Sequence, residues 1–180
     1  NLARIQTFSP PGAVPVLVDG DAVIFDSLAI MEYASEIGSR PLWPTDPIIR
    51  ARARSLFAWV HGGLSNLCAR LSFESAFYAD KRAMTAEEIA ESDRLCAVWE
   101  RTLAESGGPY LFGELSLADL ALVPVVCRIG SHRPILDGWP LSQQWCERLL
   151  ARALVRQWLD EAEALPVVVL DDYLVDAQRT

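Results

Sequence analysis

The sequence lacks the features that would indicate a membrane span or a nucleic-acid-binding surface. No segment reaches the roughly 18 uninterrupted apolar residues of a span, because the run from Leu120 to Cys127 is short and contains Pro124. Lys and Arg number 16 against 24 Asp and Glu, a formal charge of −8. Basic residues cluster only at Arg50, Arg52 and Arg54, where alanines separate them. A membrane protein and a nucleic-acid partner are therefore disfavoured.

Cysteine is also scarce. The four cysteines are separated by 28, 31 and 19 positions, with no Cys-x-x-Cys motif and no nearby pair of histidines. Each falls within an apolar helical pattern, which predicts buried structural thiols rather than disulfides or a metal site. No metal is expected, and reduced thiols are consistent with a cytoplasmic location. The residues are Cys68, Cys96, Cys127 and Cys146.

What is present begins with a strand, turn, strand and helix pattern. Residues 14–18 and 22–25 are short runs rich in β-branched residues, separated by Asp-Gly-Asp, which predicts an antiparallel hairpin. Asp26 and Ser27 then offer two N-cap residue types. Apolar residues follow at helical spacing until Gly38, which we expect as the C′ residue. Hydrophobic residues make up 51% of the 180-residue chain, as in an ordinary globular protein of one or two domains.

Two features of this pattern suggest a ligand. Pro15 stands at the head of the first strand, so Val14 is held extended with its N–H and C=O free for another backbone. Ser27 places a hydroxyl and unpaired N–H groups at a helix N-terminus, which favours a carboxylate. We expect the two features at opposite ends of one hairpin arm, a separation that suits a short anionic peptide. A simple helix cap and a rigid strand start remain the alternative interpretations.

The ordered pattern Pro-x-x-Val-Pro-x-Leu, then Gly, then an acidic residue with Ser-x-Ala-Ile-x-x-Tyr, resembles the thioredoxin-like domain of cytosolic glutathione transferases. The resemblance implies a cis peptide bond before Pro15 and glutathione binding by Ala13, Val14 and Pro15 on the cysteinyl side. It implies that Asp26 and Ser27 hold the γ-glutamyl end.

The resemblance also implies a strand–helix–strand unit upstream of Asn1. In the family, that unit carries the Ser, Tyr or Cys that stabilises the glutathione thiolate, near the start of its helix. Asn1 itself does not look like a natural start, and the residues from Asn1 to Ile5 are expected to end a helix or strand already under way. No catalytic residue is therefore assigned within this sequence.

The rest of the chain predicts an all-helical bundle. Residues 1–38 form the second half of the thioredoxin-like α/β domain, the proline-rich residues 39–46 a linker, and residues 47–180 the helical domain. A long helix is expected from Pro47 to about residue 75, interrupted by His61-Gly62-Gly63, where two glycines indicate a kink, a tightly packed neighbouring helix or a ligand wall. By resemblance this helix lines the pocket for the second, hydrophobic substrate. His61 is thus a candidate pocket residue, with a plain surface role as the alternative.

Two capping boxes start the next helices. Thr85 and Glu88 open a helix that runs to Gly107, and Ser116 and Asp119 open another over residues 120–129. The Ser-x-Ala-Asp motif resembles the N-capping motif of the glutathione transferase helical domain, so we assign it a structural role. Residues 130–140 are expected as a loop, residues 141–150 and 153–164 as the last helices, and residues 166–180 as a tail.

The resemblance implies a glutathione transferase that takes glutathione as substrate, without a metal, and adds its thiolate to a small hydrophobic electrophile. A homodimer in the cytoplasm is expected, with no nucleic acid or membrane partner. Isomerase, dehalogenase or disulfide reductase chemistry is equally compatible with the family. The alternative from another class is a non-catalytic binding or interaction protein of the same fold. Asp26, one methylene shorter than the family's Glu or Gln, is the residue that supports it.

Overall fold

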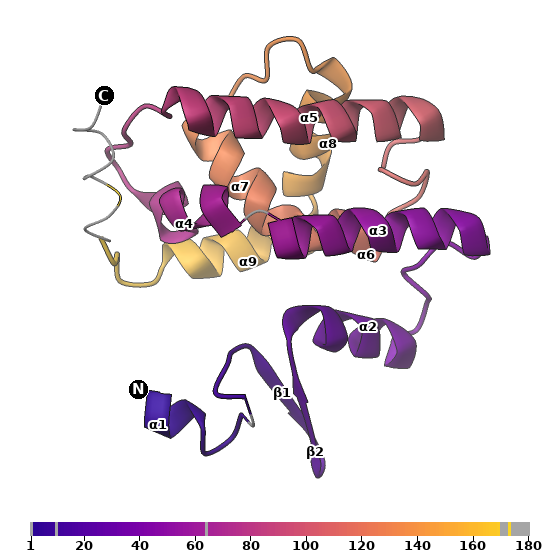
Figure 1. The fold of residues 1–180 in the computed structure, drawn as a ribbon, viewed down its shortest axis with the longest axis vertical. Helices are drawn as coiled ribbons and strands as arrows, with labels where there is room; N and C mark the ends of the chain where they lie inside the picture. The colour runs from indigo at the N-terminus through magenta and orange to yellow at the C-terminus, as the bar shows by residue number, and fades with distance from the viewer. Residues whose placement is uncertain (1, 10, 64, 170–172, 174–180) are drawn as a thin grey trace. The chain divides into compact units, whose positions relative to one another are not determined.

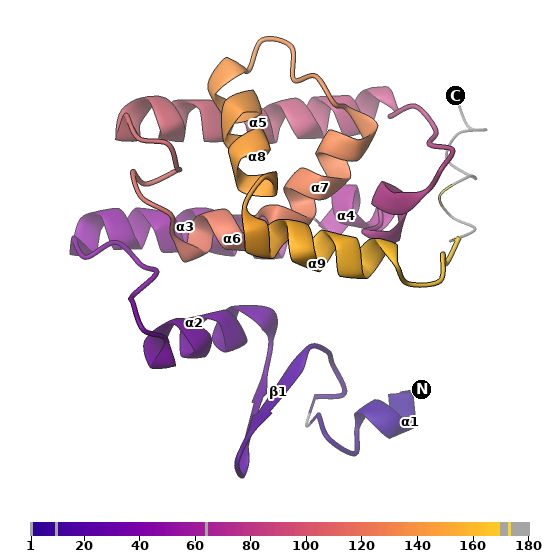
Figure 2. The same cartoon turned by 180° about the vertical axis from the view of Figure 1, so that it is seen from behind.

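The computed structural model describes residues 2–9, 11–63, 65–169 and 173. The chain divides into two compact units, residues 1–43 and residues 44–180, which are described separately (Figures 1 and 2). The first unit holds all of the described strands. The second unit is helical.

The first unit is a hairpin with a helix packed on it. Its elements are α1 (Leu2–Ile5), β1 (Val16–Asp19), β2 (Ala22–Phe25) and α2 (Ser27–Ile37). The predicted antiparallel hairpin is confirmed, with Val16 paired to Phe25 and Asp19 to Ala22. Only Gly20 and Asp21 form the turn, because Asp19 belongs to the strand, and Gly20 takes the positive φ of 57° that such a turn requires. Helix α2 packs against both strands.

The start of the chain is helical where it is described. A helix or strand already under way was expected from Asn1 to Ile5, and α1 occupies Leu2–Ile5. Asn1 itself lies outside the described residues. The unit expected upstream of Asn1, with its thiolate-stabilising residue, lies outside them too and stays a prediction.

Gly38 ends α2 at the predicted position but in a different conformation. Its φ of −71° and ψ of 165° are extended, whereas a C′ glycine is left-handed. A Cβ at this position would lie 3.0 Å from the carbonyl oxygen of Ala34. Lack of space, rather than backbone handedness, therefore favours glycine here.

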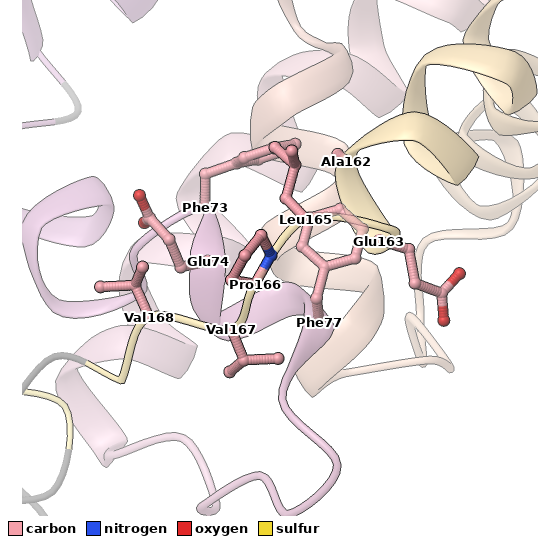
Figure 3. A pocket seen from close by; sticks show the side chains of 9 residues that line it. All are labelled: Phe73, Glu74, Phe77, Ala162, Glu163, Leu165, Pro166, Val167 and Val168. Atoms are coloured by element: carbon pink, nitrogen blue, oxygen red, sulfur yellow. The ribbon is translucent and has the colours of Figure 1, made fainter.

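The second unit departs from prediction in where its helices break. The expected helix from residue 47 to 75 is divided into two helices followed by a 3₁₀ turn, and Gly63 ends the first. The expected helix over residues 120–129 is divided at Leu122, because Pro124 in the next turn has no N–H to donate. The segment after the last helix lies against the 3₁₀ turn (Figure 3). The elements are α3 (Pro47–Gly63), α4 (Ser65–Arg70), η1 (Glu74–Phe77), α5 (Ala86–Ser106), α6 (Leu117–Ala121), α7 (Val123–His132), α8 (Pro140–Leu150) and α9 (Ala153–Glu163).

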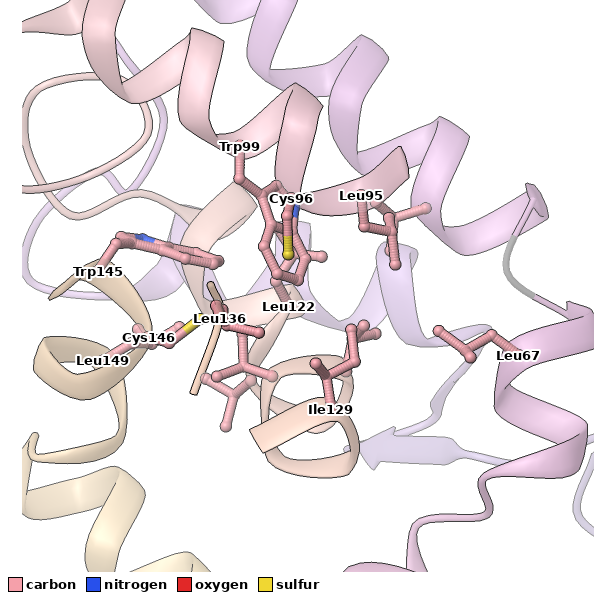
Figure 4. Packing of buried hydrophobic residues seen from close by; sticks show 14 of the residues in the cluster. Leu67, Leu95, Cys96, Trp99, Leu122, Ile129, Leu136, Trp145, Cys146 and Leu149 are labelled. Carbon is pink, nitrogen blue, oxygen red and sulfur yellow. The ribbon is translucent and has the colours of Figure 1, made fainter. Parts of the chain in front are cut away.

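The core of the second unit is built around two tryptophans. The rings of Trp99 in α5 and Trp145 in α8 lie 5.0 Å apart, and both side chains are fully buried (Figure 4). Cys96 and Cys146 are buried in the same core, as predicted. Cys68 and Cys127, which were also predicted to be buried, are only half-buried, and all four thiols are free. Helix α8 packs against both α5 and α7, so it holds the bundle together from one side.

The predicted caps are present. Thr85 Oγ1 accepts from the N–H of Glu88 at 3.2 Å, and the Glu88 carboxylate accepts from the N–H of Thr85 at 2.8 Å, which completes the first capping box. In the second box the N–H and the hydroxyl of Ser116 both donate to Asp119, at 2.9 and 2.8 Å. The Asp119 carboxylate also accepts from the N–H of Leu111 at 3.0 Å. These bonds satisfy polar groups that would otherwise be buried without partners.

The helix is interrupted at the mid-helix glycines, since α3 ends at Gly63, but the described residues place no close neighbour at Gly62. A Cβ added at Gly62 would meet no atom within 4 Å among the described residues.

Of the helices in the described part of the chain, none combines the length and apolar composition that crossing a bilayer requires.

Candidate functional site

The peptide bond between Val14 and Pro15 is cis, as the resemblance implies. Strand β1 begins only at Val16, so Val14 takes no part in the ladder. None of the turn and loop hydrogen bonds among the described residues uses the Val14 backbone, and its side chain is 63% exposed. Val14 therefore presents an open backbone edge just before the hairpin, where an extended ligand can pair with it.

A serine not identified from the sequence shapes the loop that leads to Val14. Ser9 is fully buried, and its hydroxyl donates to the carbonyl oxygen of Ala13 at 2.6 Å and accepts from the Ala13 N–H at 3.1 Å. Gly12, with φ 70°, donates its N–H to the carbonyl oxygen of Ser9 at 2.9 Å. Serine and glycine are common in such turns. Ala13, predicted beside the ligand, thus has both of its backbone groups bonded to Ser9.

Asp26 and Ser27 stand at the start of α2 with different roles. Asp26 is the N-cap, and its carboxylate accepts from the N–H of Leu28 at 2.9 Å and of Ala29 at 3.4 Å. Its φ of 75° is uncommon for a residue other than glycine, although Asp tolerates it better than most. Ser27 is the first helical residue and is half-buried. Among the described residues its hydroxyl has no hydrogen-bond partner, and it lies where a helix favours an anion.

The hairpin brings these two features together. Because β1 and β2 are antiparallel and Val16 pairs with Phe25, the residues before β1 and after β2 lie at the same end of the hairpin. The expectation that they occupy opposite ends is therefore wrong. Residues paired across two strands lie about 5 Å apart. Val14, Pro15, Asp26 and Ser27 therefore lie at the same end of the hairpin, with a backbone edge before one strand and a helix N-terminus after the other.

His61 does not share a described pocket. It is exposed near the end of α3, and its ring stacks on Phe57 at 6.0 Å with an angle of 10° between the planes. It lines neither of two pockets found among the described residues, so its role at a second-substrate site stays a prediction.

The first pocket has a volume of about 210 Å³ and the second about 290 Å³. The second lies between the end of α5 and α8 and is lined by Leu103, Ala104, Gly107, Gly108, Pro109, Leu141, Gln144 and Arg148.

The first pocket, called here the aromatic hollow, lies between η1 and the segment after α9 (Figure 3). Phe73 lines it, and the Phe73 ring packs edge-on to Phe77 at 5.2 Å and stacks with Trp158 at 5.0 Å. Most of the wall is apolar, which favours an apolar or aromatic ligand. The lining residues are Phe73, Glu74, Phe77, Ala162, Glu163, Leu165, Pro166, Val167 and Val168.

Two tyrosines hold the segment that forms one wall of the aromatic hollow. Tyr78 donates its hydroxyl to the carbonyl oxygen of Val168 at 2.8 Å. Tyr173 is 3% exposed, and its ring packs edge-on to Tyr78 at 5.0 Å. The Tyr173 hydroxyl accepts from the N–H of Arg82 at 3.0 Å and lies 2.9 Å from Nε2 of His132. The sequence does not reveal this role of the tail, because nothing local shows that Tyr173 is buried.

No metal site accompanies these features. In the described ranges no three His, Cys, Asp or Glu side chains come together in a way that would hold a metal ion. The groups that the N-terminal site offers to a ligand are the Val14 backbone, for a peptide-like partner, and the Ser27 hydroxyl, since Asp26 already accepts from the N–H groups of Leu28 and Ala29.

Fold and site together define a thioredoxin-like half-domain followed by a helical bundle, the architecture of cytosolic glutathione transferases. Residues 2–41 match the family model for the glutathione S-transferase N-terminal domain, and residues 68–162 match that for the C-terminal domain. Maleylacetoacetate isomerase of Mus musculus is 32% identical over 150 residues, covering 82% of this chain and 68% of the relative. Glutathione S-transferase theta-3 of Mus musculus is 30% identical over 146 residues, covering 73% and 61%.

Solved structures agree on the fold. A glutathione S-transferase from Rhodospirillum rubrum superposes with a TM-score of 0.70 at 22% identity, over 95% of this chain and 81% of that one. A glutathione transferase homologue from Burkholderia, solved with bound glutathione, gives a TM-score of 0.65 at 22% identity, over 89% and 78%. The chain belongs to the glutathione S-transferase family. It spans 61% to 71% of the length of the first three curated relatives it matches.

Proposed function

We propose that the protein is a glutathione S-transferase that binds glutathione at the end of its hairpin. One observation supports the proposal: the exposed backbone edge at Val14 and the Ser27 hydroxyl, which has no partner among the described residues, belong to the same end of the hairpin. The edge would pair with the cysteinyl backbone, with Pro15 and Ala13 beside it. Ser27 and Asp26 would hold the γ-glutamyl end, Ser27 by donating to its carboxylate and Asp26 by accepting from its ammonium.

The chemistry would be transfer of the glutathione sulfur to an electrophilic carbon. The thiol loses its proton, the thiolate forms the S–C bond, and the leaving group departs with the former bonding pair. The residues of this chain would contribute binding and orientation, which convert the encounter of two reactants into a nearly unimolecular step. No residue of this chain is assigned to the deprotonation, which would fall to a group upstream of Asn1.

A second candidate is a glutathione-dependent isomerase, which the 32% identity to maleylacetoacetate isomerase favours. In that chemistry the thiolate adds to a conjugated double bond, the adduct rotates, and the thiolate is eliminated again. Glutathione is regenerated in each cycle. A non-catalytic binding protein of the same fold is the third candidate, and the short Asp26 supports it.

Two measurements separate the three. Isothermal titration calorimetry of the full chain with glutathione tests binding, and S-methylglutathione serves as a probe that cannot react. Counting free thiol while an aryl chloride or a cis-enedione is consumed then tests the reaction. A transferase consumes one thiol per product, an isomerase consumes none, and a binding protein forms no product. Absence of glutathione binding at millimolar concentration would refute the proposal.

The proposal also covers the domain boundaries, the cellular location, the oligomeric state and the second substrate. We propose the domain division 1–38, 39–46 and 47–180, a cytoplasmic homodimer, and a small hydrophobic electrophile as second substrate. The family resemblance supports each of them. Sedimentation equilibrium of the full chain tests the dimer.

A further inference from the structure

Ser9 is a buried polar residue that bonds to an exposed segment. It is fully buried, whereas Ala13, Val14 and Pro15, which are proposed to lie beside glutathione, are all exposed. A hydroxyl that water does not reach needs partners within the protein. Ser9 finds both partners in one residue, because it donates to the carbonyl oxygen of Ala13 at 2.6 Å and accepts from the Ala13 N–H at 3.1 Å. Its hydroxyl is therefore used entirely on the residue that precedes the open backbone edge.

Backbone hydrogen bonds hold Ser9 itself on both sides. Its N–H donates to the carbonyl oxygen of Ile5 at the end of α1, and its carbonyl oxygen accepts from the N–H of Gly12, both at 2.9 Å. Gly12 has a positive φ of 70°, which lets the chain turn back toward the serine. The position of Ser9 is thus fixed by its own backbone, and its side chain in turn fixes the backbone of Ala13.

The Ala13 carbonyl belongs to the same peptide group as the Val14 N–H. This peptide bond is trans, and in a planar trans peptide the C=O and the N–H point in opposite directions. Because the Ala13 C=O points toward the buried Ser9 hydroxyl, the Val14 N–H points away from it. That N–H has no acceptor among the described residues. The hydrogen bond to the C=O also polarises the peptide group, which makes its N–H a stronger donor.

We propose that Ser9 is a positioning residue for glutathione: its hydroxyl orients the Ala13–Val14 peptide so that the Val14 N–H meets the cysteinyl carbonyl of the ligand. The inference rests on the proposed function, since it concerns how the same site holds glutathione. Ser9 is buried and acts through Val14 without touching the ligand. Without the hydroxyl, this peptide group can rotate, and the ligand has to order it on binding. Orientation in advance avoids that loss of conformational entropy.

Calorimetric titration of the full chain with glutathione tests the role of Ser9. We expect Ser9→Ala to bind about three- to tenfold more weakly, the range for the net contribution of one hydrogen bond. Thr7→Ala is the matched control. The Thr7 hydroxyl also donates to a backbone carbonyl, that of Arg4 at 2.7 Å, but it is exposed and bonds to Arg4 rather than to Ala13. Thr7→Ala should therefore bind like the native chain.

The rate at which the Val14 amide proton exchanges with water separates positioning from a merely structural role. Labelling with carbonyl-¹³C alanine and ¹⁵N valine selects by NMR the amides that follow an alanine, those of Val14, Val23 and Val98. Saturating glutathione should slow exchange at Val14 in the native chain and in Thr7→Ala, and several-fold less in Ser9→Ala. Val98 lies inside α5, so its exchange should be the same in every variant and serves as the reference.

The outcomes distinguish this inference from the proposed function. A native chain that does not bind glutathione would overturn both. If the native chain binds glutathione while exchange at Val14 is unchanged, only the role of Ser9 is overturned, even if Ser9→Ala does not fold. Equal affinity of Ser9→Ala and the native chain, or an equal loss in Ser9→Ala and Thr7→Ala, has the same consequence. Ser9→Cys, whose thiol is only a weak donor and acceptor, is the second variant and should also lose affinity.

Discussion

The indole N–H of Trp145 donates to the carboxylate of Asp119 at 2.9 Å, in the interior of the helical unit. Through this bond the capping residue of α6 is attached directly to the core helix α8. Burial raises the pKa of Asp119, while donors from Leu111, Ser116 and Trp145 oppose that rise. The carboxylate therefore joins the loop at Leu111 and the start of α6 to helix α8, 26 positions further along the chain.

Asp119→Asn should destabilise the helical unit. The asparagine NH₂ group would face a donor in place of an acceptor oxygen, which leaves a buried donor unpaired at a cost of about 2–3 kcal/mol. The measurement is urea unfolding followed by tryptophan fluorescence. Asp160→Asn is the matched control, because Asp160 is exposed and, among the described residues, its carboxylate pairs with Arg156 alone, at 3.4 Å, so we expect a change below about 0.5 kcal/mol. Equal stability of the two variants would show that the Asp119 bonds contribute nothing.

Ser27→Ala should weaken glutathione binding and leave the fold intact. The hydroxyl has no partner among the described residues, so its removal breaks no described hydrogen bond. Loss of one hydrogen bond to a charged carboxylate predicts about ten- to a hundredfold weaker binding by calorimetry. Ser27→Thr keeps the hydroxyl and should bind within a few-fold of the native chain. Ser55→Ala, which removes an exposed hydroxyl on α3, serves as the control.

Asp26→Ala should act differently. Asp26 caps α2, so its removal should cost about 1 kcal/mol of stability as well as affinity. A stability loss from Ser27→Ala as large as that from Asp26→Ala would contradict the roles assigned to the two residues.

The cysteines should be unreactive in the folded protein. Burial raises the pKa of Cys96 to about 11, with the charge of Arg133 opposing it, and burial also raises the pKa of Cys146. Thiolate is the reactive form, so we expect neither residue to react with iodoacetamide at pH 8 within an hour. Mass spectrometry of tryptic peptides checks this, with the urea-unfolded chain as the control in which all four react. Early labelling of Cys96 would show that its surroundings open.

Local structure is predictable from the sequence where a residue type strongly favours one structural position, such as a helix N-cap or the start of a strand. The predicted capping boxes are present, formed by Thr85 with Glu88 and by Ser116 with Asp119. The proline after Val14 directly precedes a strand, as predicted. The residues before the first strand and those after the second strand are separated along the chain, but antiparallel pairing places them at the same end of the hairpin. Their order in the sequence alone therefore does not show that they are close. The role of Tyr173 could not be predicted, since its hydrogen-bond partners lie 41 or more positions away in the sequence.

Attachment of Tyr173 to His132 should depend on pH. The carbonyl oxygen of Arg128 lies 2.9 Å from Nδ1 of His132 and must accept from it, so Nε2 of the neutral ring accepts from the Tyr173 hydroxyl. A second proton on the ring would place an N–H on Nε2 toward that hydroxyl. The hydroxyl already accepts from Arg82, and its own proton would lose its acceptor.

Burial lowers the pKa of His132 below its usual 6.5, and the positive charges of Lys81 and Arg82 lower it further. The hydrogen bond to the Arg128 carbonyl raises the pKa and so opposes these effects. Glu88, which pairs with Arg82, opposes them as well. Because the pKa of His132 is lower in the folded state, the ring is neutral above pH 6.5, and its hydrogen bond with the Tyr173 hydroxyl fully stabilises the docked position of Tyr173. That stabilisation is lost as the pH falls from 6.5 through the lowered value.

The rate of chymotryptic cleavage after Tyr173, measured by mass spectrometry between pH 7.5 and 5, checks this. Cleavage requires Tyr173 to leave its buried position, so the rate should rise several-fold as the pH falls. A free peptide of residues 165–180 corrects for the pH dependence of the protease. His132→Gln has no titrating ring, so its corrected rate should be constant with pH, and a persistent rise in this variant would assign the pH dependence to another group.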